Sequence, residues 1–349
     1  MGTSTGAVLS APPEAAIIQM VMGGWISKII TDTSRLGVPD AVKAHGPLTA
    51  AEMVARGIPA NAAALERALR VTAALGIYTE DEAGRLGPTE LSEVMTTGSP
   101  VSVKKLVDVF GGTWAEIFVG LIDAIKTGKP QARPRLGLDF WDYLKANPRE
   151  MEDFGEAMKA NSIASQMGVV AKVDFSASKR VVDVGGGFGH LAVALLEKYA
   201  ALEATVIDMP ALIPIARLRF PVKDPAVASR ITYVGGDMFE SVPEADTYVL
   251  KHIIHDWEDE KCVRLLENCR RSMQGDGRVI AVDTIMPPMG NTEAMTSKVM
   301  DVAMMVFITG KERTLAQWED LYHSAGLRIA NVTQFAANWE MNAIEGVRA

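Results

Sequence analysis

The sequence predicts an α/β protein in which a doubly wound parallel sheet follows an all-helical, winged-helix-like domain. A β-branched run at 181–184 enters a glycine-rich turn at 185–189, and an apolar helical pattern follows at 191–196. Two further strand-like segments end in an acid, Asp208 and Asp237. Strands that alternate with helices predict a parallel sheet, and such sheets bind ligands at the carboxyl ends of neighbouring strands.

The glycine-rich turn is typical of a site for a nucleotide-like cofactor. Gly185 and Gly187 lack a Cβ, so the backbone can turn sharply and contact a ligand directly. An acid at the tip of the second strand, Asp208, is placed to bind ribose hydroxyls. Asp237 and Met238 at the third tip offer an acceptor and an apolar wall to an adenine ring. An NAD-linked oxidoreductase would use the same loop and the same ribose acid, so spacing alone leaves that alternative open.

Length and composition favour a globular protein of two domains. The chain has 349 residues, of which 48% are hydrophobic and 22% charged, which is typical of folded proteins. No apolar run approaches the ~18–20 residues that span a bilayer, and the first residues lack the features of a secretory signal. Cys262 and Cys269 are seven positions apart on one predicted helix, too far apart to bridge. We therefore expect reduced core thiols, no membrane association and a cytoplasmic protein.

The N-terminal part carries helical patterns and no glycine-rich turn. An apolar helix is predicted over 15–36, a capped helix from Thr49, and a further helix over 61–76. The short segments 77–80 and 85–87 resemble the two strands of a wing. This outline raises a rival class of protein, a DNA-binding regulator of the winged-helix type.

Charge argues against that rival class. Residues 48–98 contain four arginines and no lysine against seven acids, whereas a surface that binds nucleic acid concentrates positive charge. The formal net charge of the whole chain is −8, which also argues against nucleic acid as a partner. The apolar helices instead predict an interface between two copies of the chain.

Six motifs occur in the order VVDVGGGFGH, VIDMP, YVGGDMF, LKHIIHDWEDEKC, VDTIMP and GKERT. This order resembles the S-adenosylmethionine-dependent small-molecule O-methyltransferases, most closely the class that includes caffeate O-methyltransferases and bacterial secondary-metabolite enzymes. The resemblance covers nearly the whole chain. It implies S-adenosyl-L-methionine as cofactor, S-adenosyl-L-homocysteine as product, and a homodimer formed through the N-terminal helices.

The resemblance also implies three regions. We expect a winged-helix-like dimerisation domain at 1–100 and a helical connector that lines the acceptor pocket at 101–170. A Rossmann-like methyltransferase domain that binds S-adenosylmethionine is expected at 171–349.

His255 is the predicted general base. A phenol with a pKa near ~10 is mostly protonated at neutral pH, and a histidine with a pKa near ~6.5 can remove that proton. Strand alternation would place Lys251 and His255 on one side and His252 on the other. The same alternation would point the two histidines apart, which predicts that no metal is bound. Asp256 is expected to cap the helix that follows.

The resemblance supplies two carboxylates for His255. Glu312, in the GKERT motif, matches the family pattern, and Asp283 stands where the plant enzymes have glutamate. A carboxylate at the second ring nitrogen fixes the tautomer of a histidine and stabilises its imidazolium form. Because its side chain is shorter, Asp283 is expected to orient His255 less directly. A surface ion pair with Lys311 or Arg313 is the alternative for Glu312.

Ligand contacts are also implied by the resemblance. The cofactor is expected to contact Gly185, Gly187, Asp208, Met209, Asp237, Met238, Lys251 and Trp257. The acceptor pocket is expected to be lined by Trp114, Phe154, Met158, Asn161, Met304 and Ile308, with plain core packing as the alternative for each apolar residue.

The segment before GKERT bears on the acceptor. Helical spacing predicts that Met304 and Ile308 share one face. Residues 307–310 are more apolar than the corresponding plant segment. We therefore expect a hydrophobic aromatic or polyketide-like acceptor that is methylated on a hydroxyl, with N- or C-methylation as the alternative.

Overall fold

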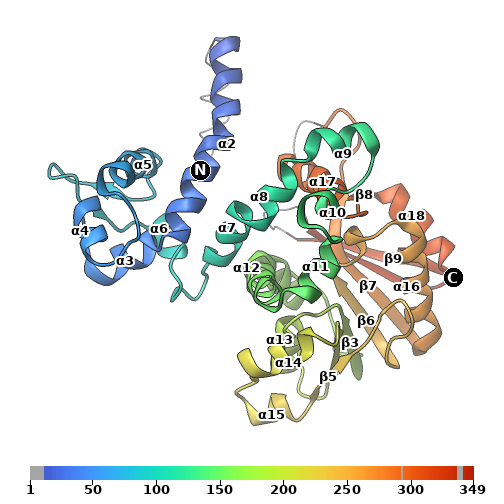
Figure 1. The fold of residues 1–349 in the computed structure, drawn as a ribbon. Helices are drawn as coiled ribbons and strands as arrows, with labels where there is room; N and C mark the ends of the chain where they lie inside the picture. Colours follow the sequence, from blue (N-terminus) through green and yellow to red (C-terminus); the bar gives the residue numbers. More distant parts are fainter. Residues whose placement is uncertain (1–11, 292–293, 336–340) are drawn as a thin grey trace. The chain divides into compact units, whose positions relative to one another are not determined.

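The structure is a computed structural model that describes residues 12–291, 294–335 and 341–349. It divides into two compact units, with the boundary between Ala115 and Glu116 (Figure 1). Each unit is described by itself. The three regions expected from the sequence, with boundaries near 100 and 170, stay a prediction.

The N-terminal unit consists of helices and one short two-stranded sheet. Its elements are α2 (Pro13–Arg35), α3 (Val38–His45), α4 (Ala50–Ala55), α5 (Ala62–Ala74), β1 (Thr79–Glu80), β2 (Leu86–Gly87), α6 (Glu90–Val94), α7 (Lys104–Gly111) and the start of α8 (Thr113–Phe118). Thr79 lies opposite Gly87 in the antiparallel pair β1–β2. The predicted outline of helices followed by a wing is therefore confirmed.

Side-chain caps determine where two of these helices begin. Thr49 Oγ1 accepts a hydrogen bond from the Glu52 backbone N–H (3.2 Å), and the Glu52 carboxylate accepts one from the Thr49 N–H (2.8 Å). Asn61 Oδ1 accepts from the Ala64 N–H (3.0 Å). A cap of this kind stabilises a helix by about 1 kcal/mol, and both predicted helix starts are confirmed.

The helix α2 keeps one apolar face exposed. Its residues Ile17, Val21 and Trp25 are 61%, 74% and 73% exposed, and their spacing of four places them on one side of the helix. The core of this unit is formed elsewhere, by the buried residues Val38, Val42, Leu48, Met53, Leu65, Leu69, Tyr78 and Leu86.

The second unit is an α/β domain. After α8 its elements are α9 (Leu121–Thr127), α10 (Ala132–Leu136), α11 (Phe140–Ala146), α12 (Pro148–Lys172), β3 (Arg180–Val184), α13 (His190–Lys198), β4 (Glu203–Asp208), α14 (Leu212–Arg219), α15 (Pro225–Ala228), β5 (Ile231–Gly235), β6 (Ala245–Lys251), the 3₁₀ turn η1 (Ile254–Asp256), α16 (Asp259–Ser272), β7 (Met273–Met286), α17 (Met295–Phe307), β8 (Arg313–Thr314), α18 (Leu315–Ser324), β9 (Leu327–Gln334) and β10 (Met341–Arg348).

The sheet runs in the order β5-β4-β3-β6-β7-β10-β9, and β8 pairs with β7 outside this order. Neighbours from β5 to β7 are parallel, whereas β10 is antiparallel to both β7 and β9. Val184, Ile207 and Val234 lie side by side, so the carboxyl ends of three strands are aligned. The doubly wound parallel sheet is confirmed, with an antiparallel edge that the sequence analysis did not predict.

Helices cover both faces of this sheet. Alternate residues of β3 show the division: Val182 and Val184 belong to a core with α16 and α18, while Val181 packs on the other face with α12 and α13 (Figure 1). Such alternation is expected of a strand that is buried on both sides. The predicted reduced thiols, Cys262 and Cys269, are buried and free on α16. Among the helices of the described ranges, none has both the length and the apolar character needed to cross a bilayer.

Gly310 lies directly against the turn η1 that follows β6. A Cβ at this position would lie 1.9 Å from the carbonyl oxygen of His255 and 2.9 Å from Asp256 Cα. Both neighbours are backbone atoms, so neither can rotate away. The segment 310–313 therefore approaches residues 254–257 as closely as backbone allows.

We expect Gly310→Ala to lower the free energy of unfolding by about 1–3 kcal/mol, because overpacking of this size displaces backbone. Urea denaturation followed by circular dichroism measures the loss. Gly98→Ala is the matched control, since a Cβ at Gly98 meets no atom within 4 Å and its effect should stay within about 0.5 kcal/mol. Equal stability of the two variants would contradict the close packing.

Candidate active site

The glycine-rich turn is tied to the tip of the neighbouring strand. Gly185 and Gly187 have φ of +65° and +59°, in the left-handed region that favours glycine. Asp208, at the end of β4, accepts hydrogen bonds from the Gly187 N–H (2.8 Å) and the Met209 N–H (2.7 Å). Burial raises the pKa of Asp208, and these two hydrogen bonds oppose the shift. A carboxylate has lone pairs to spare after two bonds, so ribose hydroxyls can still bind here.

The tip of β5 lies beside Asp208. The Gly236 N–H donates to the backbone carbonyl of Asp208 (3.0 Å), which brings the next two residues to the same edge of the sheet. Asp237 is exposed and Met238 half-buried. The structure thus brings together the two acids and the methionine that were predicted to contact an adenosine.

Trp257 belongs to an aromatic cluster. It stacks on Trp141, with ring centroids 5.8 Å apart and planes at 22°, and it meets Phe239 edge to face at 4.8 Å. Phe154 lies 5.8 Å from Trp141, so a predicted cofactor contact and a predicted acceptor contact share one neighbour. The sequence analysis missed Trp141 because no motif contains it.

Asp183 is a second residue that the sequence analysis missed. Its side chain is buried in β3, and neither carboxylate oxygen has a hydrogen-bond partner among the described residues. Burial raises its pKa to about 6, while the charge of Lys251 opposes that shift. Burial lowers the pKa of Lys251, and Asp183 and Asp283 oppose it. The sequence did contain a signal for Asp183: an acidic residue within a strand of β-branched residues is buried, and a buried charge needs a partner.

These features fit the expected cofactor. The aligned strand ends offer an open backbone at Gly187, where a Cβ would meet nothing within 4 Å. They also offer charges of both signs, on Asp183 and Lys251. A cofactor that carries an ammonium group, a carboxylate and an adenosine suits this arrangement of donors and acceptors.

The end of β6 differs from the prediction. The strand ends at Lys251, His252 has φ of +56°, and His255 lies in the turn η1. Strand alternation therefore does not extend to His255. The prediction of which side of the sheet Lys251, His252 and His255 face was wrong in its premise, because β6 ends at Lys251. Asp256 is not a helix cap, because α16 begins at Asp259 with Glu258 in the N-cap position.

His255 is surrounded by three carboxylates. Its Nδ1 lies 2.8 Å from Glu312 Oε1 and 3.9 Å from Asp283 Oδ1, and its Nε2 lies 3.5 Å from Asp256 Oδ1. Only the Glu312 contact has hydrogen-bond length. Asp283 contacts His255 less directly, as its shorter side chain suggested. The surface-pair alternative for Glu312 is wrong, since Glu312 is 5% exposed while Lys311 and Arg313 both bind Asp259.

Charge in this cluster favours a proton on His255. Burial alone would lower the pKa of His255, but the charges of Glu312, Asp283 and Asp256 outweigh it and raise the pKa to about 10. Burial raises the pKa of Asp256 and of Asp283 to about 7 each, against the charge of His255. The group as a whole attracts protons.

His252 lies next to this cluster. Its Nε2 is 3.1 Å from Ser165 Oγ on α12, and its ring centroid is 5.7 Å from that of His255. One donor atom from each of His252, His255 and Asp283 lies within 4.8 Å of the others. The argument that the two histidines point apart is therefore wrong, and these residues could hold a metal ion. The absence of a metal stays a prediction.

The predicted acceptor contacts lie on several elements. Phe154, Met158 and Asn161 are half-buried on α12. Met304 and Ile308 are buried; α17 ends at Phe307, and the Ile308 N–H still donates to the Met304 carbonyl (3.0 Å).

Trp114 belongs to the N-terminal unit, where it meets Phe110 edge to face at 5.0 Å. Its contact with an acceptor therefore stays a prediction.

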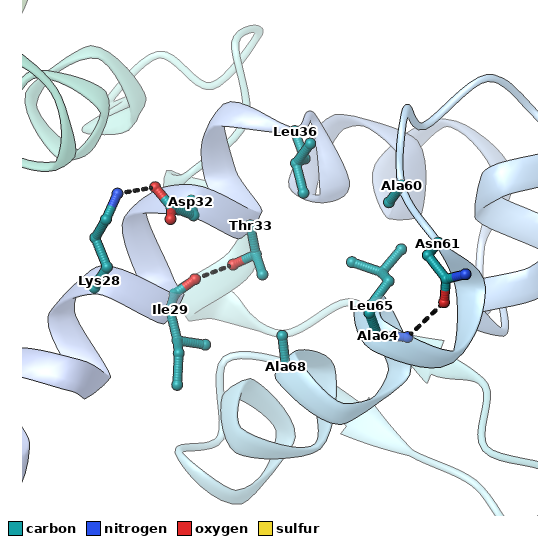
Figure 2. A pocket seen from close by; sticks show the side chains of 10 residues that line it. All are labelled: Lys28, Ile29, Asp32, Thr33, Leu36, Ala60, Asn61, Ala64, Leu65 and Ala68. Atoms are coloured by element: carbon teal, nitrogen blue, oxygen red, sulfur yellow. Dashed lines mark hydrogen bonds and ion pairs between the residues drawn. The ribbon is translucent and has the colours of Figure 1, made fainter.

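A separate pocket of about 280 Å³ lies within the N-terminal unit, between α2 and α5 (Figure 2). Most of its lining is apolar, and its charged pair Lys28–Asp32 is joined at 2.7 Å at the rim. Neither a histidine nor a cysteine lines it. This pocket therefore lacks the groups that the chemistry of a transfer reaction needs.

Comparison with known proteins agrees with these features. Residues 118–328 match the model of the O-methyltransferase domain, and residues 18–98 match that of the O-methyltransferase dimerisation domain. The chain is 29% identical to phenazine O-methyltransferase PhzM of Lysobacter antibioticus, over 94% of this chain and 95% of the relative. It is 34% identical to 2,7-dihydroxy-5-methyl-1-naphthoate 7-O-methyltransferase of Streptomyces carzinostaticus, over 88% of this chain and 92% of the relative.

Solved structures give the same result. Human N-acetylserotonin methyltransferase in complex with S-adenosylmethionine aligns with a TM-score of 0.88 and 26% identity, over 100% of both chains. The methyltransferase NcsB1 from neocarzinostatin biosynthesis, in complex with S-adenosylmethionine and 2-hydroxy-5-methyl naphthoic acid, aligns with a TM-score of 0.79 and 31% identity, over 93% of this chain and 96% of that one. The chain therefore belongs to the S-adenosylmethionine-dependent O-methyltransferases, with the dimerisation domain of that family at its N-terminus.

Proposed function

We propose that His255 is the general base in the transfer of a methyl group from S-adenosyl-L-methionine to a hydroxyl of a small aromatic acceptor. The contact between His255 Nδ1 and Glu312 Oε1, at 2.8 Å within a buried carboxylate cluster, supports this most directly. Glu312 holds one ring nitrogen, so Nε2 is left to receive a proton.

The bound cofactor supplies a methyl group on a positively charged sulfur, which needs little further activation. The chain must align the acceptor hydroxyl and take its proton. A positioned base contributes ~10²–10⁴-fold, and holding the reactants together contributes more. With a pKa raised to about 10, His255 matches a phenol of pKa ~10. Only the unprotonated fraction of His255 can take the acceptor's proton, and Glu312 and Asp283 stabilise the imidazolium that results.

The cofactor residues are proposed from their places at the strand ends. Gly185 and Gly187 let the cofactor approach the backbone closely, Asp208 binds ribose, and Asp237 with Met238 binds adenine. Further contacts are proposed for Met209, Lys251 and Trp257.

A hydrophobic aromatic acceptor is supported by the residues proposed to line its pocket. Met304 and Ile308 are buried apolar residues, and Phe154 adds an aromatic ring. Met158 and Asn161 lie on the same helix, and Trp114 is proposed as a further wall. Relatives named for phenazine and naphthoate methylation support an acceptor of fused aromatic rings. N- or C-methylation on the same scaffold is the alternative.

The proposed assembly is a homodimer formed through the N-terminal helices. The exposed apolar face of α2 supports it, because a face of that kind marks an interaction site. The acidic balance of the N-terminal unit favours a protein partner over nucleic acid. The two buried free thiols support a cytoplasmic location.

His255→Ala should lower kcat by about 10²–10⁴-fold, because it removes the group that takes the proton. Turnover is measured with a hydroxylated naphthalene or phenazine found by screening the wild-type enzyme. Binding of S-adenosylhomocysteine, measured by calorimetry, should change less than about twofold. His323→Ala, at an exposed histidine, is the matched control and should keep wild-type turnover. Full activity of His255→Ala would contradict the assignment of the base.

The dependence of kcat/KM on pH reports the charge around His255. The base acts only when it is unprotonated, so kcat/KM should rise with pH through the neutral range toward the raised pKa of about 10. Glu312→Gln keeps an oxygen acceptor but removes one negative charge, so the rising limb should move to lower pH while kcat falls. Glu319→Gln, which changes an exposed carboxylate on α18, is the control and should leave the limb in place. A limb that does not move in Glu312→Gln would contradict the carboxylate effect.

Asp208→Ala should weaken binding of S-adenosylhomocysteine by at least about tenfold, since it removes the proposed ribose acceptor and the tie to Gly187. Calorimetric titration of the dimer measures this loss. NAD should bind neither protein, which separates the proposal from an oxidoreductase. Asp224→Ala, at a carboxylate whose hydrogen bond is local to α15, controls for loss of charge. Unchanged affinity in Asp208→Ala would exclude it as the ribose acceptor.

A further inference from the structure

His252 is held in a backbone conformation that few residues adopt. Its φ is +56°. Among the non-glycine residues of the described ranges, only Ala294 also has a positive φ. Such a conformation is strained and persists where its surroundings fix it. Here the His252 N–H donates to the Val282 carbonyl (3.0 Å), and the ring contacts Ser165. The ring is thus fixed at both the backbone and the side chain.

Ser165 Oγ contacts both its own helix and the ring of His252. It lies 3.0 Å from the Ser162 carbonyl and 3.1 Å from His252 Nε2. The hydroxyl has one hydrogen, so when that hydrogen is donated to Ser162, the oxygen accepts from an N–H at His252 Nε2. The neutral imidazole that donates from Nε2 has a lone pair at Nδ1.

Burial and two neighbouring cationic groups disfavour a charge on His252. Burial lowers its pKa well below the usual value, and Lys251 and His255 lower it further. The neighbour from α12, Ser165, is an uncharged hydroxyl. The neighbour from β7, Asp283, has an oxygen within 4.8 Å of a donor atom on each of the two histidines. The Nδ1 lone pair has no hydrogen-bond partner among the described residues. His252 is partly exposed, so water can reach that nitrogen until an acceptor molecule displaces it.

Ser165 places His252 on the acceptor side of α12. Phe154, Met158, Asn161 and Ser165 are separated by four, three and four positions, so they follow one face of the helix. The first three are the proposed acceptor contacts. His252 therefore contacts this face at Ser165 and also has a donor atom within 4.8 Å of one on the proposed base, His255.

We infer that His252 is a specificity-determining residue, whose Nδ1 accepts a hydrogen bond from a second O–H or N–H of the acceptor, beside the hydroxyl that is methylated. The inference rests on the proposed function, because it takes His255 as the place of the reacting hydroxyl. It defines the acceptor more narrowly: an aromatic compound with two neighbouring donors, in adjacent or peri positions.

The energetic reason is the cost of an unpaired acceptor. When an acceptor molecule excludes water, a buried nitrogen without a donor costs about 1–3 kcal/mol. Since 1.4 kcal/mol corresponds to tenfold in affinity, compounds with one hydroxyl should bind about tenfold or more weakly than their dihydroxy counterparts. A site built to bind a hydroxyl discriminates strongly against analogues that lack it.

Matched ligands and matched variants test this inference. Calorimetry on dimer saturated with S-adenosylhomocysteine, which needs no turnover, compares 2,3-dihydroxynaphthalene with 2-naphthol and 1,8-dihydroxynaphthalene with 1-naphthol. His252→Asn keeps an oxygen acceptor close to the Nδ1 position and tolerates positive φ. His252→Leu has nearly the same shape and no acceptor. Ser165→Ala removes the hydrogen bond at His252 Nε2.

The wild type should bind at least one diol about tenfold more tightly than its partner. His252→Leu should reduce that ratio to about twofold or less, His252→Asn should keep most of it, and Ser165→Ala should give an intermediate value. All variants should bind S-adenosylhomocysteine within about twofold of the wild type, which shows that the fold and cofactor site are intact.

Three results would overturn the inference while leaving the proposed function in place. One is an equal ratio in wild type and His252→Leu, and another is wild-type binding without preference for either diol. The third is loss of S-adenosylhomocysteine binding in His252→Leu at unchanged stability, which would assign His252 to the cofactor. If no naphthalene binds while S-adenosylhomocysteine does, the acceptor class inferred here is wrong. Failure of the proposed function looks different, because His255→Ala would then retain turnover.

Discussion

The active site depends on a clamp between two segments that are far apart in the sequence. Gly310 packs against the backbone of residues 255 and 256, and the Lys311 N–H donates to the His255 carbonyl (3.0 Å). The buried guanidinium of Arg313 donates to the carbonyls of Ile254 (3.0 Å) and Trp257 (2.8 Å). These bonds hold the turn after β6 against the start of β8, and Glu312 lies between their anchor points. The contact between His255 and Glu312 follows from this backbone packing.

The same clamp explains why so much negative charge can remain buried. Asp256, Asp283 and Glu312 come from three different segments, yet all lie within 4 Å of one imidazole ring. Mutual repulsion would separate them if their backbones were free. A single proton on His255 reduces that repulsion, which is why the ring has a high affinity for it. The backbone packing that fixes the three carboxylates therefore also determines the proton affinity of His255.

Much of the fold and of the cofactor site could be predicted from the sequence. The turn at 185–189, the acids at strand ends and the caps at Thr49 and Asn61 depend on residues that are close together in the sequence. Such local patterns can be recognised without knowing the tertiary structure. The environment of His252 could not be predicted, because strand alternation applies only while the backbone stays extended, and β6 ends one residue earlier. Trp141 was missed for another reason: stacking between distant segments leaves no pattern in a single sequence.

The position of β10 has a consequence for folding of the sheet. This strand lies between β7 and β9, so the sheet stays interrupted until residues 341–348 have paired. A partly folded chain in which β10 is still unpaired would therefore expose the edge of β7, a strand rich in buried β-branched residues. Unpaired edges of that kind recruit other strands. Docking of β10 thus protects the methyltransferase unit from aggregation, although this strand lies far along the chain from the glycine-rich turn.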